Sequence, residues 1–167
     1  MWNTSSVKYM QFAFSMAYEF NSDLSNWDVS NVEILQGMFT SNIKFNQDLS
    51  SWDTSSVESM HGTFFIAEAF NGDVSTWNTS KVWEHRAHFY GAYKFNQDVS
   101  MWDMSPATDA AYMFGRATSF NQDLCAWGDV FPYNEAHDIF TRSGCTYTDT
   151  PDEAQQGPFC ASMCADR

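Results

Sequence analysis

The sequence predicts an α/β repeat solenoid built from 25-residue coils, each with a short strand followed by a short helix. Two observations fix the period. The tryptophans recur every 25 residues, and a Phe-Asn pair, an Asp and a second Phe keep the same spacing. A third observation, a change of apolar spacing within each unit, places the strand and the helix. The periodic tryptophans are Trp2, Trp27, Trp52, Trp77, Trp102 and Trp127.

The strand is expected over residues 24–32. Trp27 and Val29 lie two residues apart there, so they share one face of an extended chain. The helix is expected next, with Ser30 or Asn31 as its cap, because apolar residues then recur at steps of three and four. The helical apolar positions are Val32, Leu35, Met38 and Phe39. Such a coil cannot bury its apolar face alone, so the coils must stack with Trp on Trp and Phe on Phe.

The chain divides into two parts. Residues 1–124 hold five coils, the first incomplete, and residues 125–167 hold a degenerate last coil and a C-terminal cap. The chain begins in mid-coil with no polar residues over its first aromatic layer, which suggests a fragment of a longer protein.

Composition excludes several classes of function. The net charge of −13, with only 8 Lys and Arg, argues against binding to nucleic acid. The sequence has no apolar run long enough to span a membrane, so no membrane insertion is expected in this segment. With 15 Phe, 7 Trp and 7 Tyr, the chain is too aromatic for an acidic disordered protein.

The four cysteines lie together in the C-terminal part. Cys125, Cys145, Cys160 and Cys164 predict two disulfides that staple the cap, with three connectivities open and Cys125–Cys145 preferred. A zinc site is the alternative, but the spacing has no Cys-x-x-Cys pair and His137 is the imidazole at hand. Disulfides indicate an oxidising compartment.

The unit FNQDLSSWDTSSVESMHGTF, residues 45–64, resembles the 25-residue repeat of BspA-like leucine-rich-repeat surface proteins, the mycoplasma lipoprotein-type repeat. The resemblance covers residues 1 to about 124. It implies a leucine-rich-repeat-like fold and an extracellular or cell-surface protein used for adhesion or for recognition of a protein or glycan. It supplies no catalytic residues and no cofactor.

The candidate binding face lies on the outward side of the expected strands. The residue after each Trp points away from the core there, which gives the acidic column Asp28, Asp53, Asn78 and Asp103. Asn3 and Asn78 also begin glycosylation sequons, and a glycan would obstruct this face. A basic or cation-bridged partner would suit the column.

Two other sets of residues have a functional and a structural interpretation. The Phe-Asn-x-Asp columns could hold Ca²⁺, but the structural interpretation is favoured: Asn bonds the neighbouring coil and Asp caps a turn. His85 and His88 could bind a metal, but a partly buried, hydrogen-bonded pair is favoured. We therefore expect no metal, no cofactor and no catalysis. Assembly of neighbouring copies into a sheet or filament is the alternative to a recognition module.

Overall fold

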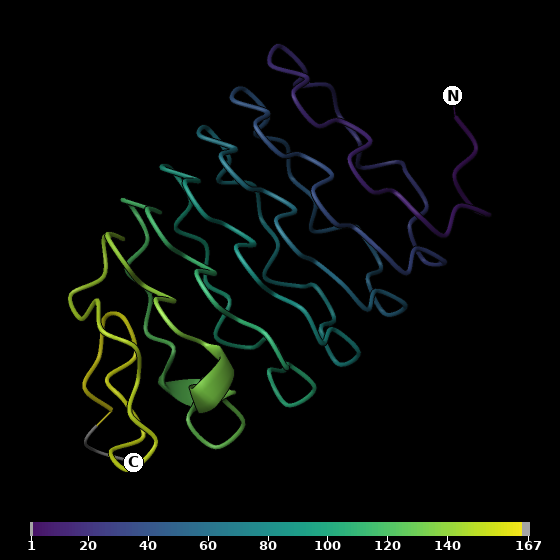
Figure 1. Cartoon of the computed structure of the whole chain (residues 1–167). Helices are drawn as coiled ribbons and strands as arrows, with labels where there is room; N and C mark the ends of the chain where they lie inside the picture. The colour runs from purple at the N-terminus through teal and green to yellow at the C-terminus, as the bar shows by residue number, and fades with distance from the viewer. Residues whose placement is uncertain (1, 165–167) are drawn as a thin grey trace.

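The computed structural model describes residues 2–164. Successive 25-residue repeats lie side by side in sequence order, from the N-terminal to the C-terminal end (Figure 1). We call each repeat a layer. Two short 3₁₀-helices, η1 (Cys125–Trp127) and η2 (Tyr133–Glu135), are the helices among the described residues, and both lie in the last layer.

Neighbouring layers are joined by backbone hydrogen bonds. Isolated parallel β-bridges link the layers at one register, at Tyr9, Ile34, Ser59, Glu84 and Asp109. After each bridge, alternate N–H groups donate to the next layer and the groups between them donate three residues back within their own layer. In the third layer the inter-layer donors are Met60, Gly62, Phe64 and Ile66, which donate to the carbonyls of Glu84, Arg86, His88 and Tyr90 at 2.7–2.9 Å.

This alternation depends on left-handed backbone at two positions in each layer. The first position is Phe12, Gly37, Gly62, Ala87 and Tyr112, and the second is Met16, Ser41, Ile66, Gly91 and Arg116, all with φ between 50° and 70°. In the last layer the equivalents are Asp138 and Arg142, shifted by its one extra residue. A left-handed residue turns the next peptide toward the neighbouring layer, so the chain cannot continue as a right-handed helix.

The predicted α/β solenoid with leucine-rich-repeat-like coils is therefore wrong: residues 2–164 contain no α-helix and no extended β-strand. Where the helix was expected, N–H groups bond to the next layer instead of to the carbonyl four residues back. Where the strand was expected, the backbone N–H of Trp27 donates to the carbonyl of Leu24, and that of Val32 donates to the carbonyl of Val29. These bonds make two consecutive tight turns.

Aromatic side chains fill the interior. Two phenylalanines of one layer stack face to face, as Phe64 and Phe70 do at 3.8 Å between ring centroids. The same pair recurs in the next layer, with 5.5 Å between Phe64 and Phe89 and 6.1 Å between Phe70 and Phe95. The near-parallel rings of neighbouring layers, at 5.5–6.1 Å, lie within the range in which aromatic pairs attract one another beyond the area they bury. The interior is thus a double column of rings.

The tryptophans form a third column beside the phenylalanines. Trp52, Trp77 and Trp102 are buried and stack at 6.0–6.2 Å between centroids. Each indole N–H donates to a carbonyl of the preceding layer, as Trp77 does to Leu49 at 3.0 Å. These bonds satisfy the one polar atom of each buried indole.

The Asn and Asp columns have the structural roles expected for them. Each Asn side chain accepts a hydrogen bond from the backbone of the next layer, as Asn46 does from the N–H of Asn71 at 2.7 Å. Each Asp accepts the N–H two residues later, as Asp48 does from Ser50 at 2.8 Å. Serine donors of this kind hold the pKa of Asp23 and Asp48 below the ordinary range. The structural interpretation is confirmed.

Two disulfides hold the C-terminal segment against the last layers. Cys125 pairs with Cys164 and Cys145 pairs with Cys160, with Cα atoms 5.5 Å and 4.6 Å apart. The prediction of two disulfides is confirmed, whereas the preferred pairing of Cys125 with Cys145 is wrong. Cys160 lies opposite Asp123 in an antiparallel bridge, so the tail folds back over the last repeat and brings Cys164 to Cys125.

Candidate functional site

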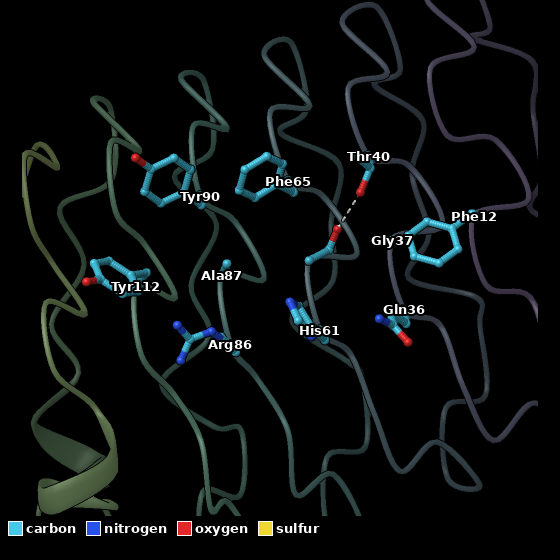
Figure 2. Close-up of a pocket in the computed structure, with 11 residues that line it drawn as sticks. Phe12, Gln36, Gly37, Thr40, His61, Phe65, Arg86, Ala87, Tyr90 and Tyr112 are labelled. Atoms are coloured by element: carbon cyan, nitrogen blue, oxygen red, sulfur yellow. Dashed lines mark hydrogen bonds between the residues drawn. The ribbon is translucent and has the colours of Figure 1, made fainter.

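A groove of about 660 Å³ crosses the middle layers on the side where helices were expected. It lies between two rows of side chains and over a floor with little or no side chain (Figure 2). One row is Thr40, Phe65 and Tyr90, and the other is Gln36, His61 and Arg86. The floor is Gly37, Gly62 and Ala87, which hold one register in three consecutive layers. The rings of Phe12 and Tyr112 stand at its two ends (Figure 2).

The floor is open because glycine occupies the first left-handed position in two consecutive layers. Gly62 has φ of +55°, and a Cβ built on it would meet only the Cβ of Phe65, at 3.5 Å. Gly37 is glycine for a second reason, because the ring of Phe12 lies where its Cβ would be. At the same register Phe12 and Tyr112 carry large rings, so the backbone itself accepts side chains there.

The floor offers no free backbone groups. The N–H of Gly62 donates to Arg86, and its carbonyl accepts from the Phe65 N–H at 3.0 Å and the Thr40 hydroxyl at 3.1 Å. The N–H groups of Gly37 and Ala87 donate to the next layer in the same way, and both carbonyls accept from three residues ahead. A ligand in the groove must therefore be held by side chains.

One wall and one end are aromatic. Phe65 and Tyr90 stack at 5.2 Å, and Tyr90 meets Tyr112 edge to face at 6.4 Å. The guanidinium of Arg116 lies 5.8 Å from the centroid of the Tyr90 ring, within cation–π range. Since none of these rings is fully buried, the wall presents apolar surface to the groove.

The opposite wall carries planar polar groups. Nδ1 of His61 lies 3.1 Å from Oε1 of Glu84, and Arg86 lies 3.3 Å from Oδ2 of Asp109 and 5.6 Å from the Tyr112 ring. The two carboxylates stand behind the wall, because none of the described residues that line the groove is acidic. The wall therefore supplies nitrogen donors, and the guanidinium charge of Arg86 is already balanced by Asp109.

This arrangement suits reversible binding. Apolar rings on one side and a few oriented polar groups on the other are typical of small-molecule sites. The hydroxyls among the described lining residues belong to Thr40, Tyr90 and Tyr112. The Thr40 hydroxyl is already bonded to the floor carbonyl of Gly62.

The acidic column proposed from the sequence lies outside the groove. Asp28, Asp53, Asn78 and Asp103 are exposed, and each side chain accepts the N–H of the serine two residues later at 2.9–3.1 Å. Serine donors lower the pKa of Asp28, Asp53 and Asp103. The column caps turns instead of lying on a strand, and its binding role stays a prediction, as does glycosylation of the exposed Asn3 and Asn78.

The histidine pair lies in the core. His85 and His88 are completely buried, and none of their four ring nitrogens has a hydrogen-bond partner among the described residues. His88 stacks on Phe89 at 4.2 Å, and the two imidazole centroids are 6.1 Å apart. Burial lowers the pKa of His85 to about 4 and that of His88 well below its usual value. The expected partial burial and hydrogen bonding are both wrong.

Sequence reasoning missed the groove residues because their layer positions were assigned to a helix. The available signal was glycine in the middle of that expected helix, at Gly37 and again 25 residues later at Gly62. Glycine is unfavourable inside a helix but suits a left-handed position. A second signal was the change of residue type at one register, from Gln36 to His61 to Arg86.

Within residues 2–164, the structure has no helix of the length and apolar character needed to cross a bilayer. The sequence matches a family model described as Mycoplasma protein of unknown function, DUF285, over residues 1–93 and again over residues 48–150. Comparisons with curated proteins and with solved structures gave no match. Because the two family matches together span residues 1–150, the chain belongs to the DUF285 family.

Proposed function

We propose that this protein is a non-enzymatic recognition module that acts outside the cell or at its surface and binds a protein or glycan partner through the groove. One observation carries the proposal: a preformed groove whose backbone is the same in every layer and whose wall side chains differ from layer to layer. Repeat proteins use such surfaces for recognition, because the stack supports the backbone while the side chains select the partner.

Two further features support this proposal. Both disulfides are of the kind that persists in oxidising, extracellular surroundings. The repeat also resembles that of BspA-like surface proteins, and this resemblance favours a role in adhesion without extending to a leucine-rich-repeat fold.

The experiment compares two faces of the same protein. Labelled protein is titrated onto intact cells and extracellular matrix, and saturable binding is measured. Replacing Gly62 by Phe puts a bulky ring at the centre of the groove floor, and we expect at least about a tenfold loss of affinity, or about 1.4 kcal/mol. The matched control changes Asp28, Asp53 and Asp103 together to Asn, away from the groove, and should bind like the parent protein.

Two outcomes of this experiment would contradict the proposal or relocate the binding site. Absence of saturable binding by the parent protein would overturn the recognition function. Loss of binding in the Asn variant, with binding kept in Gly62→Phe, would move the site to the acidic column.

Assembly into a sheet or filament is a second candidate, favoured by exposed apolar side chains in the first layer. Trp2 is 79% exposed, and Tyr9, Phe12, Met16 and Tyr18 are each more than half exposed. Exposed apolar patches of this kind often mark interfaces. Light scattering over a concentration series tests it: particle size that grows with concentration favours assembly, and constant size favours the recognition module.

A further inference from the structure

We propose that the groove is a binding site for a short, neutral oligosaccharide. This inference rests on the proposed recognition function and names the chemistry of its ligand. The argument depends on what the floor, the two walls and the charge of the groove can and cannot bind.

The saturated floor argues against a peptide held as an added strand. Strand addition needs free N–H and C=O groups along an edge. The three floor residues have none, because the N–H groups of Gly37, Gly62 and Ala87 all bond to the next layer and their carbonyls all accept within their own layer. Recognition in the groove therefore comes from side chains alone.

The side chains match the two kinds of surface on a sugar ring. A pyranose has a flat face of C–H groups, which packs on an aromatic ring, and a rim of hydroxyl groups, which needs hydrogen-bonding partners. Phe65 and Tyr90 present ring surface on one wall, while the amide of Gln36, the imidazole of His61 and the guanidinium of Arg86 are on the facing wall. A ligand lying along the floor would meet rings on one side and donors on the other.

The positions of the end rings make the site short. The Cα positions of Gly37 and Ala87 are separated by two layer spacings, or about 10 Å at ~4.8 Å a layer. Phe12 closes one end by covering Gly37, and Tyr112 stands at the other end beside Arg86. The space between them suits a few sugar units and not a long polymer threaded through the stack.

The charge of the groove favours a neutral ligand. His61 and Arg86 are each paired with a carboxylate, at 3.1 Å and 3.3 Å, so the groove gains donors without net positive charge. The whole chain carries −13, which repels polyanions at a distance. A sulfated or carboxylated glycan would thus approach against the field of the protein and find no unpaired cation in the groove.

The test uses defined oligosaccharides. Gluco-, manno- and chito-oligosaccharides from mono- to hexasaccharide are titrated into the parent protein by calorimetry, with heparin fragments as the acidic comparison. We expect affinity for at least one neutral series to rise with length and then level off once the groove is filled. Gly62→Phe should weaken it at least about tenfold.

Gly62→Ala is the matched control, because it imposes the same left-handed strain but adds only a methyl group with one ordinary contact. It should bind within about twofold of the parent, since a tenfold change would require about 1.4 kcal/mol. Arg86→Lys keeps the charge but removes the planar fork of donors, and it should weaken binding of the same sugars.

The outcomes separate this inference from the function on which it rests. If cells bind the protein through the groove but enzymatic deglycosylation of those cells has no effect and no neutral sugar binds, the glycan inference is overturned and the recognition function stands. Binding of heparin fragments in preference to neutral sugars would overturn the charge argument. Equal binding by Gly62→Phe and the parent protein would remove the groove as the site.

Discussion

The interior columns and the groove use the same layers in opposite ways. In the interior, each layer repeats the same rings at the same register, so Phe64 stacks on Phe89 and Trp52 on Trp77. In the groove, equivalent positions change from Gln36 to His61 to Arg86 and from Thr40 to Phe65 to Tyr90. A stack needs identical neighbours to pack rings, whereas a binding surface needs different side chains on a constant backbone.

The comparison teaches where to look for function in a chain of this kind. The recurring residues satisfy one another: Asn bonds the next layer, Asp caps its own turn, and the indoles of Trp52, Trp77 and Trp102 donate to the layer before. Polar groups used in this way are not available to a ligand. The residues that break the repeat are therefore the informative ones, and they include the walls of the groove and the buried histidine pair.

The largest expected effect comes from breaking an interior column. Trp77→Ala should lower the free energy of unfolding by about 3–5 kcal/mol, because Trp77 is 3% exposed and packs against rings in both neighbouring layers. It also loses the hydrogen bond from its indole N–H to Leu49. Trp2→Ala, at 79% exposure, should cost less than about 0.5 kcal/mol. Denaturant titration measures both, and equal losses would contradict a packed column.

The sequence was sufficient for the period and for the residues of the core, but not for the backbone that carries them. Apolar residues at steps of three and four favour a helix, and the same spacing arises here from turns that close three residues back. Whether an N–H group bonds within its own layer or to the next layer depends on how the layers pack. The sequence of a single layer does not show this. The groove was missed for the same reason, since Gly62 lines a surface only when Gly37 and Ala87 lie beside it.

The second prediction concerns the histidine pair, which departs from the repetition of the same side chains at each register of the interior. In the neighbouring layers Met60 and Ala110 take the position of His85, and Thr63 and Met113 take the position of His88. Burial lowers the pKa of His85 from 6.5 to about 4, so between these values the unfolded chain binds a proton that the folded chain excludes. The free energy of unfolding is therefore highest above pH 6.5 and falls as the pH drops toward 4. His85 alone should account for about 3 kcal/mol of that loss.

A double variant, His85→Met with His88→Met, provides the comparison. Methionine removes four buried ring nitrogens that lack partners, so the variant should be more stable than the parent at pH 7 by about 1–3 kcal/mol. Its stability should also vary much less between pH 6.5 and 4. Thermal unfolding over this range measures both effects. Parallel pH curves for the two proteins would show that the imidazoles are not the source of acid sensitivity.

The smallest expected effect compares two residues of the groove floor. Gly62 and Ala87 share a register and a left-handed backbone, with φ of +55° and +50°. Gly62→Ala should cost about 1 kcal/mol, because its Cβ makes one ordinary contact, with Phe65, and only the backbone preference is lost. Ala87→Gly should raise the free energy of unfolding by less than about 1 kcal/mol. Relief of the left-handed strain is offset by the greater freedom of glycine in the unfolded chain. Denaturant midpoints should therefore shift in opposite directions. Two shifts of the same sign would mean that side-chain packing, and not backbone conformation, decides which residue the floor accepts.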